Sequence, residues 1–145
     1  MNPTRVALAL PLPLALPLLV ALVPLSLVSA QTADTMPARV AERQISTFNR
    51  HDLDGFMALY ADDAVLYEFP SGKVLAQGKA AIRERYAPVF KTKLPAVRVE
   101  PRIVNGAFVA DNERWTGKPG ERNQAVWMYE IRGGLIRRVW MVAVN

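Results

Sequence analysis

The chain begins with a long apolar run and then changes to periodic apolar and polar positions. Residues 6–28 are apolar almost without interruption. Further along, Ala41, Ile45 and Phe48 recur at the spacing of one helical face, which predicts a helix that ends near residues 49–51. The first segment and the rest of the chain therefore need separate interpretations.

Two more helices and a short hairpin are predicted next. Asp52 is suited to cap a second helix, whose apolar side comprises Leu53, Phe56, Met57 and Tyr60. Residues 64–69 predict a strand, which the turn at residues 70–72 connects to a brief partner at 74–76. A third helix should follow Gly78 with Ile82, Tyr86 and Val89 on one side, and Pro88 should kink or shorten it.

The last third of the chain predicts strands. Val97, Val99, Pro101 and Ile103 alternate with charged residues, and Asn105-Gly106 is a two-residue hairpin signal. Strands at residues 108–116, 124–131 and 135–144 complete a four-strand antiparallel meander. Three helices, an early hairpin and this meander indicate one α+β domain.

Residues 1–30 have the pattern of a cleaved signal peptide. The segment carries one base, Arg5, and Val28-Ser29-Ala30 places small side chains where a signal peptidase cleaves, so Gln31 becomes the new N-terminus. The alternative is a membrane anchor, since about 20 apolar residues can span a bilayer. Several prolines in the segment and the absence of a following Lys/Arg cluster favour cleavage. We expect an exported protein, periplasmic or secreted, with no stable membrane anchor after processing.

After that cleavage, residues 31–37 read as a linker and residues 38–145 as the folded domain. Removal of the leader takes away only Arg5, so the net charge falls from +5 to +4. The bases are spread along the chain, whereas a nucleic-acid interface needs them clustered, so no nucleic-acid partner is expected. The chain has no cysteine and one histidine, which excludes thiol chemistry and multi-histidine metal sites.

Three segments of this domain resemble the nuclear transport factor 2-like superfamily, and more closely its SnoaL-like and ketosteroid isomerase-like branch. They are FNRHDLDGFMALYADDAV at 48–65, GKAAIR at 78–83 and YEIRGGLI at 129–136. The segments follow the order of the family, and the resemblance covers about residues 38–144. It implies a cone-shaped fold, in which a strongly curved, mostly antiparallel sheet wraps around three N-terminal helices.

The resemblance also implies a conical pocket. Its register turns the Trp127/Tyr129 face of one strand and the Trp140/Val142 face of the next toward the inside. The helix face that carries Gln44 and Phe48 lines the same pocket. A wall of this kind suits a small, mostly apolar molecule.

Glu68 is the candidate catalytic residue, because it falls where the isomerase branch carries its proton-abstracting carboxylate. A carboxylate walled by apolar groups has a raised pKa and can act as a general base. The alternative is a solvent-exposed residue at the strand edge, and Phe69 after it departs from the isomerase pattern. Gln44 and Trp127 occupy the positions of that branch's oxyanion-stabilising tyrosine and aspartate, so we do not expect a steroid isomerase.

Other polar residues have structural interpretations. His51 could serve as a base, but the helix corner favours a structural role, and Asp62 with Asp63 fits backbone bonding at a turn better than a metal site. Glu113 and Arg114 are adjacent on one predicted strand, so only one of them can face the pocket.

The resulting hypothesis is an exported domain that binds a small apolar molecule, with acid–base chemistry of an isomerase or hydrolase type if Glu68 is catalytic. The competing hypothesis is a non-catalytic module that dimerises or docks a partner protein through its sheet. The resemblance implies a homodimer. No cofactor motif or metal-ligand set is found, so neither is expected.

Overall fold

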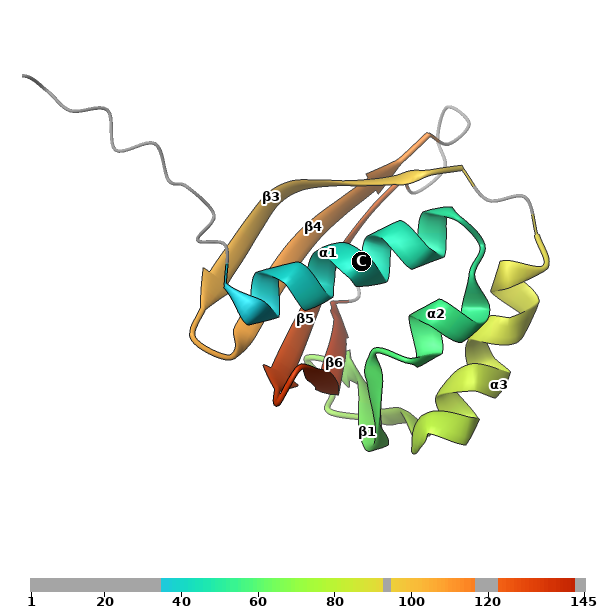
Figure 1. Cartoon of the computed structure of the whole chain (residues 1–145), viewed down its shortest axis with the longest axis horizontal. Coiled ribbons are helices and arrows are strands. Elements are labelled where there is room, and N and C mark those ends of the chain that lie inside the picture. The colour runs from blue at the N-terminus through green and yellow to red at the C-terminus, as the bar shows by residue number, and fades with distance from the viewer. Residues whose placement is uncertain (1–34, 93–94, 117–122, 143–145) are drawn as a thin grey trace, which may run out of the picture.

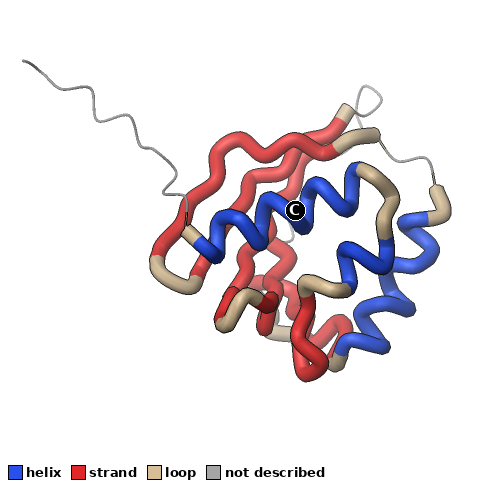
Figure 2. Tube along the Cα trace, in the orientation of Figure 1, coloured by secondary structure: helices blue, strands red, loops and turns tan. Residues whose placement is uncertain are grey.

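A computed structural model describes residues 35–92, 95–116 and 123–142. Its helices are α1 (Met36–Asn49), α2 (Leu53–Met57) and α3 (Lys79–Phe90). Its strands are β1 (Tyr60–Phe69), β2 (Val74–Gln77), β3 (Val97–Asn105), β4 (Phe108–Trp115), β5 (Gln124–Arg132) and β6 (Leu135–Val142). Figure 1 shows a curved sheet with α1 lying across its concave side, and Figure 2 shows the separation of helices from strands. The predicted α+β cone architecture is confirmed.

Local sequence signals set the helix boundaries. The Thr35 side chain accepts a hydrogen bond from the Ala38 backbone N–H, so α1 begins at Met36, within the predicted linker. Asp52 caps α2 by accepting from the Gly55 backbone N–H at 2.8 Å. Helix α3 continues two residues past Pro88, to Phe90. The predicted signal peptide and residues 31–34 of the linker lie outside the described residues.

The six strands form an open, mixed sheet in the order β2-β1-β6-β5-β4-β3. Strands β3 to β6 are the predicted antiparallel meander, and its hairpin turns contain Gly106, Gly133 and Gly134 at positive φ. Strand β1 joins the meander by pairing parallel to β6. This long-range pairing brings the early hairpin and the helices onto the same sheet.

Strand β1 starts earlier than the sequence pattern predicts. Tyr60 pairs with Ile136 of β6, and the Ile136 backbone N–H donates to the Leu59 carbonyl at 2.8 Å. Tyr60 is buried in the core, so α2 ends at Met57 instead of continuing through it. Tertiary packing overrides the local helical spacing here.

Two β-bulges change which residues face the concave side. The pairing of β5 with β6 passes from Glu130–Arg138 to Ile131–Ile136, so Arg137 is an extra residue in β6. In the pairing of β3 with β4, Val99 opposes Glu113 and Arg102 opposes Asp111, so β3 also contains an extra residue. An extra residue reverses the alternation of side chains beyond it.

The hydrophobic core lies between the helices and the concave face of the sheet. Its fully buried members include Ala41, Phe56, Ile82, Tyr129 and Val139. In the part of the chain that the structure describes, no helix is both long and apolar enough to cross a membrane.

Candidate functional site

A cavity of about 460 Å³ lies on the concave side of the sheet. Residues of α1, α3 and the strands β3 to β5 surround it, together with Pro95 before β3. They are Gln44, Ile45, Phe48, Arg85, Tyr86, Val89, Pro95, Val97, Glu113, Trp115, Ala125 and Trp127. Arg85 and Pro95 are exposed and stand at its rim, whereas Gln44 and Glu113 are buried. The wall of the cavity is therefore apolar and aromatic, polar side chains lie at its deep end, and a charged side chain lies at its rim.

Helical and strand periodicity explain this lining. Phe48 follows Gln44 by four residues and Ile45 by three, so it lies next to both on one side of α1. Ala125 and Trp127 alternate along β5 toward the same side as Glu113, because Glu113 pairs with Ala125 across β4 and β5.

Glu113 is the one carboxyl group among the lining residues, and its side chain carries a proton near neutral pH. It is 8% exposed, and the Tyr129 hydroxyl donates to its Oε1 atom at 3.1 Å. Burial raises the pKa of Glu113 to about 8, an effect that the Tyr129 hydrogen bond opposes and the nearby Asp111 reinforces. The Oε2 atom has no hydrogen bond to another described residue. A protonated Glu113 can donate to an acceptor in the cavity.

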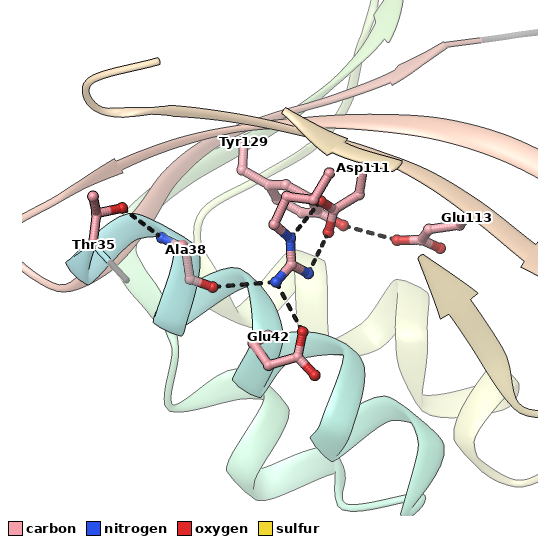
Figure 3. A network of polar contacts seen from close by, with 7 residues as sticks. Thr35, Ala38, Glu42, Asp111, Glu113 and Tyr129 are labelled. Atoms are coloured by element: carbon pink, nitrogen blue, oxygen red, sulfur yellow. Dashed lines mark hydrogen bonds and ion pairs between the residues drawn. The ribbon is translucent and has the colours of Figure 1, made fainter. Parts of the chain in front are cut away.

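Asp111 lies two residues before Glu113 on β4, and the Arg102 side chain, which is 11% exposed, forms an ion pair with it. Arg102 donates from its Nε to Oδ1 of Asp111 at 2.7 Å and from Nη2 to Oδ2 at 2.8 Å. The same guanidinium also donates to Glu42 at 2.8 Å and to the Ala38 carbonyl at 3.3 Å (Figure 3). Asp111 therefore forms an ion pair with Arg102, whereas the hydrogen-bond partner of Glu113 is the neutral hydroxyl of Tyr129.

Neutral polar groups lie in the wall of the cavity and in the core beside it. Gln44 Oε1, in the wall, and the Tyr60 hydroxyl, in the core, are buried and make no hydrogen bond of normal geometry within the described residues, although Gln44 and Tyr86 lie close enough to Tyr60 to affect its pKa. Burial raises the pKa of Tyr60 and of Tyr86 well above the ordinary tyrosine value, so both hydroxyls stay protonated. Buried groups without a partner cost free energy unless a ligand or water satisfies them.

The structure brings some of the predicted site residues together. Gln44, Phe48 and Trp127 line the cavity. Tyr129 is fully buried on the concave side and touches the site through its hydrogen bond to Glu113.

Trp140 and Val142 do not face inward, which corrects the expectation from the family register. Tyr129 pairs with Val139, whereas Trp140 pairs with Met128 and stacks on Tyr67 with ring centroids 5.9 Å apart. The bulge at Arg137 shifts the alternation of β6, so Trp140 and Val142 lie on the convex face.

Glu68 does not line the cavity. Its position on β1 is paired with Met141 on the concave side, yet its carboxylate accepts a hydrogen bond from the Ser71 hydroxyl at 2.7 Å. The turn after β1 provides this partner, and the cavity lies across the sheet near α1, α3 and β3 to β5. Glu68 is therefore held at the end of its strand.

Sequence reasoning did not select Glu113, although a signal was present. Val109, Asp111 and Glu113 alternate on β4, and Val109 is an apolar residue that a core requires. Because side chains two residues apart lie on the same face of a strand, Asp111 and Glu113 share the inward face of Val109. His51, Asp62 and Asp63 are exposed, and no cluster that could hold a metal ion occurs within the described ranges.

A protein-family model described as a SnoaL-like domain matches residues 41–139. The chain belongs to this family, as its resemblance predicted. A protein of Kribbella flavida DSM 17836, provisionally assigned as a ketosteroid isomerase, is 20% identical, with a TM-score of 0.64 over 76% of this chain and 78% of its own.

Two other solved structures have the same fold. A nuclear transport factor 2-like protein of unknown function from Mesorhizobium loti is 18% identical, with a TM-score of 0.64 over 76% of this chain and 92% of its own. A Sinorhizobium meliloti protein, provisionally assigned as a polyketide cyclase, is 22% identical, with a TM-score of 0.57 over 71% and 93%. At these identities the likeness establishes the fold alone.

Proposed function

We propose that this SnoaL-like domain binds a small, mostly apolar molecule with a hydrogen-bond acceptor, and that Glu113 is its proton-exchanging group. The observation that carries this proposal is one buried carboxyl, held by Tyr129, in the wall of an aromatic cavity. A protonated Glu113 polarises a carbonyl oxygen by donating to it. Loss of a proton from the carbon next to that carbonyl to a water molecule then becomes easier, because the negative charge that develops on the oxygen is stabilised.

This proposal predicts that aromatic ketones bind in the cavity. Burying about 150 Å² of apolar surface at roughly 25 cal/mol per Å² gives about 4 kcal/mol before the costs of association, so micromolar affinity is the best that a generic probe should reach. Titration of the purified protein with 2-acetylnaphthalene should quench tryptophan fluorescence. Trp127→Ala should weaken binding about tenfold, because it removes an aromatic wall.

Trp140→Ala is the matched control. It removes the same side chain from the convex face, so the affinity for 2-acetylnaphthalene should stay within about twofold of wild type. Absence of binding to wild-type protein, or equal losses in the two variants, would contradict the proposed site.

A homodimer across the convex face is a second proposal, and it is compatible with the first. Tyr67, Trp140 and Phe108 form an aromatic cluster there, and Phe69 and Phe108 are 44% and 48% exposed. Exposed apolar clusters on a sheet face are typical of association surfaces. Light scattering at micromolar concentration should give twice the monomer mass for wild type and the monomer mass for Phe108→Glu. A monomeric wild-type protein would eliminate this proposal.

Export is the third proposal, and it rests on residues 1–30 alone. If Val28-Ser29-Ala30 is a cleavage site, protein recovered from the periplasm or medium should begin at Gln31. N-terminal sequencing tests this directly. Membrane-bound protein that retains Met1 would favour the anchor.

A further inference from the structure

Arg85 is the second ionisable residue of the cavity wall, besides Glu113 and apart from the tyrosine. It lies on α3 three residues after buried Ile82 and four before Val89, so it shares their helical face and that of Tyr86. Its side chain reaches the cavity, yet the residue is exposed. The guanidinium therefore stands where the cavity meets solvent.

Arg85 has no ion-pair or hydrogen-bond partner among the described residues. Its neighbour Arg83, in contrast, pairs with Asp54 of α2. Four arginines of the sheet are also paired: Arg102 with Asp111, Arg137 with Asp63, and Arg132 and Arg138 with Glu130. Arg85 thus offers an unused set of donors beside an apolar cavity.

The cavity has a carboxyl group at depth and a cation at its rim. Glu113, which is protonated near neutral pH, lies at depth, and Arg85 lies at the rim. An anionic group of a ligand would meet no cation among the lining residues at depth, whereas at the rim the guanidinium can bind a carboxylate through two parallel hydrogen bonds. At the rim that anion also keeps part of its hydration, which lowers the cost of binding it.

We propose that the cavity selects small aromatic or alicyclic carboxylates: the carboxylate binds Arg85 at the rim, the ring packs against Phe48 and Trp127, and an acceptor at the far end meets Glu113. This inference rests on the proposed function and adds to it the charge of the ligand and its orientation. The net positive charge of the chain favours the approach of such anions.

Two probes that differ only in the carboxylate test this inference. They are 2-acetylnaphthalene, which is neutral, and 6-acetyl-2-naphthoate, which is anionic at pH 7. Wild-type protein should bind the anion about tenfold more tightly at low salt. The advantage should decrease at about 1 M salt, because exposed charge pairs are screened.

Arg85→Gln should abolish the preference for the anion, so that the two probes bind this variant with about equal affinity. Arg98→Gln is the matched control. Arg98 is exposed and has no ion pair among the described residues. It lies opposite Arg114 in the register of β3 and β4, on the face of the sheet away from the cavity lining. This variant removes an equal charge near the cavity without touching its wall, so the preference should remain.

The outcomes distinguish a failure of the role proposed for Arg85 from a failure of the proposed function. Equal affinities of wild type for both probes, or a preference that survives in Arg85→Gln, would overturn the role of Arg85 and leave the proposed function standing. If Arg98→Gln lost the preference for the anion to the same extent as Arg85→Gln, the preference would reflect general electrostatic attraction. That result would also overturn the inference. Failure of both probes to bind would overturn the proposed function itself.

Discussion

Replacing Glu113 with glutamine should make ligand binding independent of pH. In wild type, a neutral ketone needs the protonated carboxyl, and the pKa of Glu113 is raised to about 8 by burial. The protonated fraction then falls about tenfold between pH 7 and 9, so the affinity for 2-acetylnaphthalene should fall about tenfold as well. Glutamine keeps the size and a donor N–H but cannot ionise. Fluorescence titrations across this range would measure the difference.

The same substitution should remove a pH dependence of stability. The unfolded chain releases the Glu113 proton near pH 4.5, whereas the folded protein keeps it until about pH 8. Between these values the folded state holds the extra proton, so the free energy of unfolding falls as pH rises, by about 1.4 kcal/mol per unit. Urea unfolding from pH 5 to 8 should show this slope in wild type relative to Glu113→Gln.

Glu68→Gln is the matched control for both measurements, because it makes the same chemical change outside the cavity. We expect it to retain the wild-type pH profile of ketone binding. If Glu68→Gln abolished the profile and Glu113→Gln preserved it, the assignment of the proton-exchanging group to Glu113 would be wrong. The family-based prediction for Glu68 would then be favoured.

Arg102→Met should destabilise the fold by about 3–5 kcal/mol, because it leaves a buried carboxylate without its counter-ion. Asp111 is completely buried and receives two hydrogen bonds from Arg102. Urea unfolding at pH 7 would measure the loss. The double variant Arg102→Met/Asp111→Leu should recover much of it, since neither charge is then present.

Arg83→Met is the control for this effect. Its ion pair with Asp54 joins two exposed side chains, which are 45% and 89% exposed, so its loss should cost less than about 1 kcal/mol. If Arg83→Met and Arg102→Met lowered the free energy of unfolding equally, the ion pair of Arg102 with Asp111 would contribute no more to stability than an exposed ion pair.

The sequence determined the elements that depend on neighbouring residues. Thr35 and Asp52 cap their helices, and the Asn105-Gly106 and Gly133-Gly134 turns form hairpins, because each signal acts through contacts a few residues apart. The family-specific segments then fixed the order of these elements and the cone architecture. Gln44, Phe48 and Trp127 line the cavity, where the family resemblance placed them, because simple periodicity holds through their elements.

Only the tertiary structure decided which carboxyl group enters the site. The bulge at Arg137 turned Trp140 and Val142 outward, and the bulge before Arg102 turned that arginine inward while leaving Ile103 64% exposed. A bulge reverses alternation and depends on pairing between strands, so a period-two pattern in one strand does not reveal it. Arg102 could then neutralise Asp111, and Glu113 remained the protonated carboxyl of the cavity because strands distant in sequence buried it together with Tyr129.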